Sequence, residues 1–117
     1  MRVARSASAT STAGRPGFAV CPASGRGLEE AAGGRPVQVV CATGLVTLFF
    51  SAEPVRDYEG AKRCDTEAYG AWCRGLLARG VYPPPSQFEA WFPSLAHTDE
   101  HVERTVAAAA AAFADLP

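Results

Sequence analysis

Three consecutive prolines, Pro83 to Pro85, constrain the fold of this chain more than any other feature. Each proline fixes its own φ angle and lacks a backbone N–H, so the segment fits neither a helix interior nor the middle of a sheet. The prolines therefore divide the chain into upstream and downstream elements. With 117 residues, both groups belong to one domain at most.

Two strands and one helix are predicted upstream of the prolines. Val37–Cys41 is rich in β-branched residues, Leu45–Ser51 is almost wholly apolar, and the break at residues 42–44 favours a hairpin. Apolar residues point to both sides of the second strand, which predicts that both of its faces are covered. Asp57 is a good N-cap and Gly80 suits the C′ position, so we expect one helix between them. Its predicted buried stripe comprises Ala61, Cys64, Ala68, Tyr69, Trp72 and Leu76.

Downstream, Val81–Tyr82 and the segment AWFPSLA are predicted to be short strands. A second helix is expected after Thr98 as N-cap, because acidic residues follow it in the first turn. Its predicted buried stripe comprises Val102, Val106, Ala109, Phe113 and Leu116. The resulting order, β-β-α-β-β-α, predicts an α+β fold in which two helices pack on one face of a small sheet of short strands. We place this domain at residues 29–117.

Residues 1–28 are rich in Arg, Ser and Ala, lack acidic residues and show no sustained period. We predict a disordered tail, with a short helical end at Leu28–Ala32 that Gly33 and Gly34 stop. The same composition is also that of a transit peptide, so the expected location is the cytoplasm, or a plastid if the tail is a targeting signal.

The charge balance and the apolar runs give no sign of nucleic-acid or membrane partners. The formal net charge is −1, and no apolar run approaches the roughly 20 residues that a spanning helix needs. The four cysteines, at positions 21, 41, 64 and 73, form no CxxC pair, so we interpret them as free thiols rather than zinc ligands.

The chain is short of recognisable catalytic parts. His97 and His101 are four residues apart, but Thr98 rather than Glu follows the first histidine, so we expect no metal site. The single lysine, Lys62, lies among charged residues in the predicted helix and is a poor candidate nucleophile.

Glu89 is the one acid in an apolar stretch, beside Phe88, Trp91 and Phe92. A carboxylate in such surroundings either pairs with a cation or lies at the rim of a site. The other reading is a surface glutamate on an exposed turn with the aromatic rings pointing inward. The residues alone favour neither reading.

Several blocks in the same order resemble the C-terminal end of the glutamate-1-semialdehyde 2,1-aminomutase family. They are TLFF, PVRDYEGAKRCDTEAY, LLARGVY, PSQFEA and SLAHTDE, within a segment from about Pro36 to Phe113. The resemblance implies the small C-terminal domain of a fold-type-I pyridoxal-phosphate enzyme of the class III aminotransferase family. That family forms 5-aminolevulinate, the precursor of tetrapyrroles, and works as a homodimer.

In this family the small domain packs on a large cofactor domain, and the glutamate of SQFEA faces the substrate. The resemblance assigns that role to Glu89, with Ser86 and Gln87 as its supporting turn. A carboxylate there repels a second substrate carboxylate and accepts hydrogen bonds from an ammonium group, which favours substrates that carry amino groups.

The chain departs from the family in two respects. It lacks the large domain with its Schiff-base lysine, so we expect no catalytic or cofactor-binding residue here and no pyridoxal phosphate bound to this chain alone. Residues 43–46 read TGLV where the family usually has GSMF. We therefore expect an isomerase domain that is inactive alone. The alternatives are a non-catalytic module that docks on a large-domain partner, or a gene fragment without function.

Overall fold

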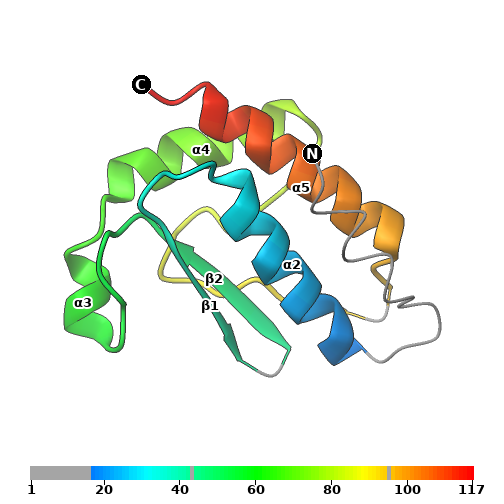
Figure 1. Cartoon of the computed structure of the whole chain (residues 1–117), viewed down its shortest axis with the longest axis horizontal. Coiled ribbons are helices and arrows are strands. Elements are labelled where there is room, and N and C mark those ends of the chain that lie inside the picture. The colour runs from blue at the N-terminus through cyan, green and yellow to red at the C-terminus, as the bar shows by residue number, and fades with distance from the viewer. Residues whose placement is uncertain (1–16, 43, 95) are drawn as a thin grey trace.

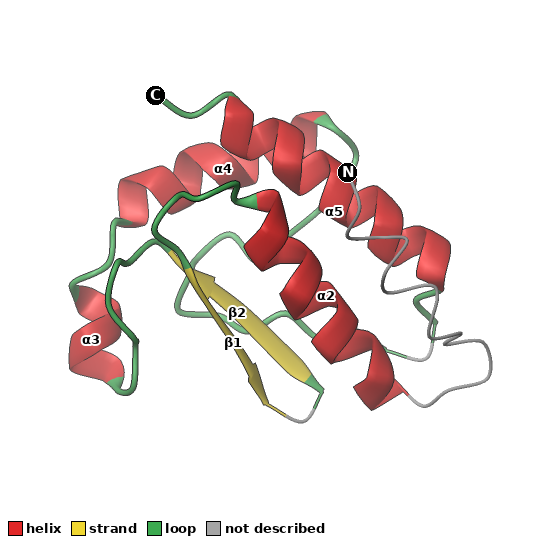
Figure 2. Cartoon of the chain, in the orientation of Figure 1, coloured by secondary structure: helices red, strands yellow, loops and turns green. Residues whose placement is uncertain are grey.

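A two-stranded sheet and four helices make up the computed structural model, which describes residues 17–42, 44–94 and 96–117. In chain order they are α2 (Gly17–Ala31), β1 (Gln38–Ala42), β2 (Leu45–Phe49), α3 (Tyr58–Lys62), α4 (Thr66–Ala78) and α5 (Asp99–Ala114). Helix α2 lies against both strands, α5 packs on α2 and on α4, and α3 stands apart beside the far end of the hairpin (Figure 1). Figure 2 shows α2 lying along the two-stranded sheet with α5 beside it, which confirms a small α+β fold.

The prediction of a disordered tail through residue 28 is wrong for residues 17–28, because α2 begins at Gly17. Leu28 is buried in the core, and a Cβ added at Gly25 would meet Cys41 Sγ at 2.4 Å. Glycine at position 25 thus allows α2 to approach β1 closely. Packing on the hairpin and α5 stabilises a helix whose own glycines and Pro22 disfavour it. The predicted tail over residues 1–16 lies outside the described residues.

The hairpin predicted from the sequence is present. β1 and β2 pair antiparallel, with Val39 opposite Leu48, and Gly44 adopts a φ of 76° at the turn. Val46 and Leu48 on one face of β2 are buried, whereas Leu45, Thr47 and Phe49 on the other face are half-buried. The second face is therefore covered only in part.

The single helix predicted from Asp57 to Gly80 is two helices. Asp57 accepts a hydrogen bond from the Gly60 N–H at 2.7 Å, and Asp65 accepts one from the Ala68 N–H at 3.0 Å, so each aspartate caps its own helix. The Asp65 N–H donates to the carbonyl of Phe50 at 3.0 Å, which ties the break to the end of β2. Gly80 has a φ of 84° and ends α4 as predicted.

Trp72 is the centre of the core and is fully buried. Its ring lies 4.9 Å from Phe113 and 6.0 Å from Phe50, and its Nε1 donates to the carbonyl of Ala109 at 3.2 Å. The second predicted stripe faces this core, with Leu116 at its edge. Of the first, Tyr69, Trp72 and Leu76 face it and Ala68 lies at its edge, whereas Ala61 and Cys64 are buried outside this cluster. Beside Trp72, a Cβ added at Gly75 would lie 2.8 Å from Ala112 Cβ, so α4 and α5 touch almost backbone to backbone.

The two strands predicted after the first helix do not form. Within the described residues, one isolated bridge between Val46 and Trp91 joins this region to the hairpin. Prolines at positions 83–85 and 93 leave too few consecutive N–H groups for a ladder. The observed order is therefore α-β-β-α-α-α. None of the described helices is long and apolar enough to cross a membrane.

Candidate functional site

Ser86–Glu89 forms a tight turn that is closed by its own hydrogen bonds. The Glu89 N–H donates to the carbonyl of Ser86 at 3.1 Å, and the Ser86 N–H donates back to Glu89 Oε1 at 3.2 Å. Ser86 Oγ accepts from the Phe88 N–H at 3.1 Å. Glu89 is exposed, and no ion pair among the described residues involves it. One carboxylate oxygen thus holds the turn and the other is open to a ligand.

The aromatic residues near Glu89 do not all point inward. Phe92 is 72% exposed and Phe88 is 49% exposed, whereas Trp91 is half-buried with its ring 5.9 Å from that of Trp72. Neither reading of the sequence described this arrangement in full. Glu89 is an unpaired surface acid, but it lies between exposed rings.

Gln87 anchors the Ser86–Glu89 turn to α3. Its side chain is 2% exposed, and Nε2 donates to the carbonyl of Ala61 at 3.3 Å, at the end of α3. Gln87 Oε1 is buried and has no hydrogen-bond partner.

The Pro84 carbonyl is held by Tyr69, which was predicted only as a core residue, and by Cys73, which was predicted only as a free thiol. The Tyr69 hydroxyl donates to the Pro84 carbonyl at 2.9 Å, and Cys73 Sγ lies 3.5 Å from the same oxygen. Burial raises the pKa of the Tyr69 phenol and of the Cys73 thiol, so both remain protonated donors at neutral pH. The sequence did contain a signal for this pairing, because Tyr69 and Cys73 are four residues apart in a helix and so lie on the same face.

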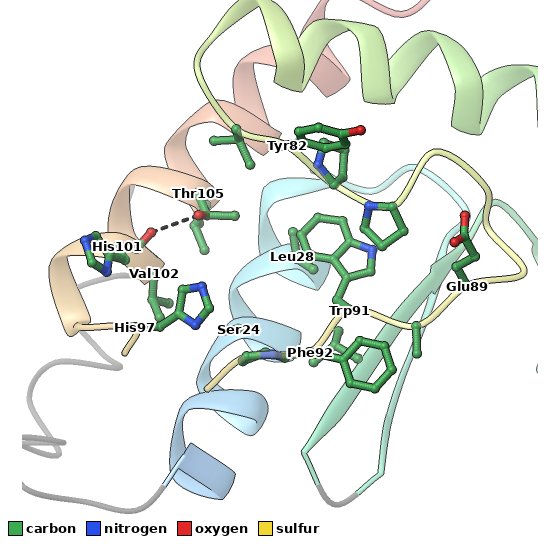
Figure 3. A pocket seen from close by; sticks show the side chains of 17 residues that line it. Ser24, Leu28, Tyr82, Glu89, Trp91, Phe92, His97, His101, Val102 and Thr105 are labelled. Atoms are coloured by element: carbon green, nitrogen blue, oxygen red, sulfur yellow. Dashed lines mark hydrogen bonds between the residues drawn. The ribbon is translucent and has the colours of Figure 1, made fainter. Parts of the chain in front are cut away.

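A cleft of about 700 Å³ extends from Glu89 toward α5 (Figure 3). Tyr82 and Glu89 lie at one end, and His97 and His101 lie at the other. The cleft is lined mostly by apolar side chains, among them Leu28, Val46, Trp91, Val102 and Val106. Such a surface suits an apolar or aromatic group with few polar contacts.

Both histidines of the cleft serve backbone turns. His97 Nδ1 accepts from the Ser94 N–H at 2.9 Å, and His101 Nδ1 accepts from the Thr98 N–H at 3.1 Å. The second contact completes a capping box at the start of α5. Over residues 17–42, 44–94 and 96–117, no group of three or more His, Cys, Asp or Glu side chains is placed to hold a metal ion.

Lys62 does not line the cleft. Its Nζ pairs with Glu59 Oε1 at 3.0 Å and lies 5.2 Å from the centre of the exposed Tyr58 ring. An exposed, ion-paired ammonium is a poor nucleophile. The single lysine of the sequence therefore does not fit a Schiff-base role toward pyridoxal phosphate.

No family model matches this chain, but curated relatives do, and the three described below share one name. The glutamate-1-semialdehyde 2,1-aminomutase of Thermomicrobium roseum is 48% identical over 93 residues, which are 78% of this chain and 22% of that protein. The chain is homologous to part of the glutamate-1-semialdehyde 2,1-aminomutases. The aminomutase of Desulfosudis oleivorans is 48% identical over 77% of this chain and 22% of its own length.

The aminomutase of Anaeromyxobacter sp. strain K is 48% identical over 99 residues, 83% of this chain and 23% of its own length. This match is longer than residues 29–117, so the similarity to the aminomutases extends upstream into α2. The chain spans about a fifth of the length of the curated relatives it matches.

Proposed function

We propose that this chain is the small C-terminal domain of a pyridoxal-phosphate-dependent glutamate-1-semialdehyde 2,1-aminomutase, and that these 117 residues alone are inactive. The 48% identity to named aminomutases supports the family, and the small α+β fold suits a domain that packs on a larger one. The remaining length of such an enzyme provides the cofactor site.

The single observation that carries the proposal is the 48% identity to named aminomutases, and the structure adds an exposed carboxylate set among exposed aromatic rings. We call this surface the aromatic face. It comprises Tyr82 and Phe92, which line the cleft with Glu89, and the adjoining ring pair of Tyr58 and Phe88. Tyr82 is 82% exposed, and the rings of Tyr58 and Phe88 lie 5.8 Å apart. Large apolar side chains gathered at a surface mark a contact area rather than a solvated one. The face therefore suits contact with the large domain, with Glu89 at the rim of the shared pocket.

The chemistry of Glu89 agrees with an amino-group substrate. A carboxylate attracts and accepts hydrogen bonds from an ammonium group, and it repels a second substrate carboxylate. Ser86 and Gln87 keep this carboxylate in place through the turn and through the contact with Ala61. Pyridoxal phosphate would act as the electron sink of the reaction. Because Lys62 does not fit its attachment, no residue of this chain is assigned to the cofactor.

A chimera tests the proposal directly. Residues 17–117 replace the matching segment of the Thermomicrobium roseum aminomutase, and 5-aminolevulinate formation from glutamate-1-semialdehyde is measured. We expect activity in the chimera, and neither activity nor a bound-cofactor absorbance band in the pure chain with added pyridoxal phosphate. A folded chimera without activity, or an active pure chain, would contradict the proposal.

The aromatic face equally favours a second function, a non-catalytic module that docks on a large-domain partner. Co-elution of the pure chain with a separately expressed large domain is expected under both functions. Aminolevulinate production by the complex distinguishes them, since the docking module would bind without restoring activity. If the chain neither binds a large domain nor restores activity, the remaining explanation is a gene fragment without function. A reading frame for the large domain in the DNA directly upstream would identify such a fragment.

A further inference from the structure

The three consecutive prolines can form hydrogen bonds to the rest of the fold only through their carbonyl oxygens. Residues Pro83 to Pro85 have no backbone N–H, so their only hydrogen-bonding groups are carbonyl oxygens. Such a segment can be fixed only by donors from elsewhere in the fold. At Pro84 two donors converge on one carbonyl, the hydroxyl of Tyr69 at 2.9 Å and the thiol of Cys73 at 3.5 Å.

The Tyr69 donor is itself held rigidly. The side chain is 2% exposed, and its ring packs against Trp72 and edge-on against Phe50. Burial is the main cause that raises the pKa of the Tyr69 phenol, and the neighbouring Cys73 is the next. The hydroxyl therefore stays protonated at neutral pH and remains a donor to the Pro84 carbonyl.

The loop that carries Glu89 is fixed at both ends. At its far end, the Trp91 N–H donates to the Val46 carbonyl at 2.7 Å, and the Val46 N–H donates back to Trp91 at 3.1 Å. At its near end, the contacts to the Pro84 carbonyl are the hydrogen bonds that hold the triple proline. If the near end is released, only the Trp91 bridge and the Gln87 contact with Ala61 still hold the loop, so Ser86–Glu89 should become more mobile.

We infer that Tyr69 is a positioning residue for Glu89, acting through the carbonyl of Pro84. The catalytic consequence of this contact rests on the proposed function, whereas its effect on the loop does not. Removing the hydroxyl should loosen Ser86–Glu89 while leaving the fold intact, because the ring stays in the core.

The first experiment uses the 117-residue chain and needs no activity. In Tyr69→Phe, amide hydrogen exchange at Ser86 and Glu89 should become roughly fivefold faster, the factor that one such hydrogen bond represents. Tyr82→Phe is the matched control, because it removes a hydroxyl from an 82% exposed side chain of the same loop, and exchange should not change. Unchanged exchange in Tyr69→Phe, or an equal increase throughout α4, would overturn the inference.

The second experiment uses the chimera with the aminomutase of Thermomicrobium roseum. Tyr69→Phe should lower kcat/KM roughly fivefold in the otherwise unchanged chimera and have little effect in the Glu89→Gln background. Effects that simply add would mean that Tyr69 does not act through Glu89. If the unmodified chimera forms no aminolevulinate, the proposed function fails, and the exchange experiment alone decides the positioning role.

Discussion

Gln87 Nε2 lies 3.3 Å from the carbonyl oxygen of Ala61, and this contact ties the turn that carries Glu89 to the end of α3. A short helix and a proline-rich loop, 26 residues apart in sequence, thus depend on one buried amide. Since α3 packs at the edge of the fold, the amide also holds α3 itself in place.

Replacing Gln87 with Ala should lower the free energy of unfolding by about 2 kcal/mol, because a buried hydrogen bond and buried volume are lost together. Urea denaturation followed by tryptophan fluorescence measures the change. Gln38→Ala is the matched control, since Gln38 is half-buried and its Nε2 reaches the Ser51 carbonyl only at 3.4 Å. Equal losses in the two variants would show that the Ala61 contact contributes nothing specific.

The two glycines inside α4 should respond to alanine in opposite directions. A Cβ at Gly70 would lie 3.5 Å from Arg74 Nη1, an ordinary contact, so Gly70→Ala should add roughly 0.5–1 kcal/mol to the free energy of unfolding. A Cβ at Gly75 would lie 2.8 Å from Ala112 Cβ, so overpacking should make Gly75→Ala about 1 kcal/mol less stable. Thermal and urea denaturation of both variants check the signs, and stabilisation by Gly75→Ala would refute the close helix contact.

The thiols of α4 and of the break before it should resist alkylation. Burial raises the pKa of Cys64 and of Cys73, so each has a smaller thiolate fraction at pH 8 than an ordinary cysteine. Iodoacetamide should therefore label the exposed Cys41 well before either of them, as site-resolved mass spectrometry would show. In urea, Cys64 and Cys73 should react as fast as Cys41. Rapid labelling of Cys73 in the folded chain would mean that the contact with Pro84 opens readily.

Reversing the charge at position 89 should change which substrates the chimeric aminomutase accepts. Glu89→Arg should lower kcat/KM for glutamate-1-semialdehyde at least about tenfold and raise activity toward dicarboxylic amino acids, because a charge-assisted contact becomes repulsive to ammonium. Glu67→Arg makes the same charge change on an exposed position of α4 and serves as the control. An unchanged preference in Glu89→Arg would remove Glu89 from the substrate pocket.

Local rules predicted the parts of this fold that depend on neighbouring residues. The caps at Asp57, Gly80 and Thr98 and the β1–β2 hairpin follow from short patterns, and the structure confirms them. The break before α4 also had a local signal, since Asp65 precedes Thr-Glu-Ala just as an N-cap would. Apolar residues continue at helical spacing on both sides of the break, so the pattern predicted one uninterrupted helix.

Features that depend on tertiary contacts were not predictable in this way. Helix α2 looked disordered because its glycines and proline disfavour a helix, and only packing on the hairpin and α5 explains it. Tyr69 was predicted as core, which is correct for its ring, but its hydroxyl bonds a carbonyl 15 residues away. The Glu89 carboxylate accepts a hydrogen bond from the Ser86 N–H. The charge pattern of the sequence had suggested only a cation as its partner.

The close contact between Gly75 and Ala112 leaves this chain little room for substitutions at either position. Nothing smaller than glycine exists for position 75, so a larger residue at position 112 cannot be compensated across the gap. Only a shift of whole helices would accommodate it, and that shift would carry Tyr69 and Cys73 with α4. A larger residue at the buried position Ala112 would thereby be expected to displace the two donors that hold the Pro84 carbonyl, although Ala112 itself lies in α5.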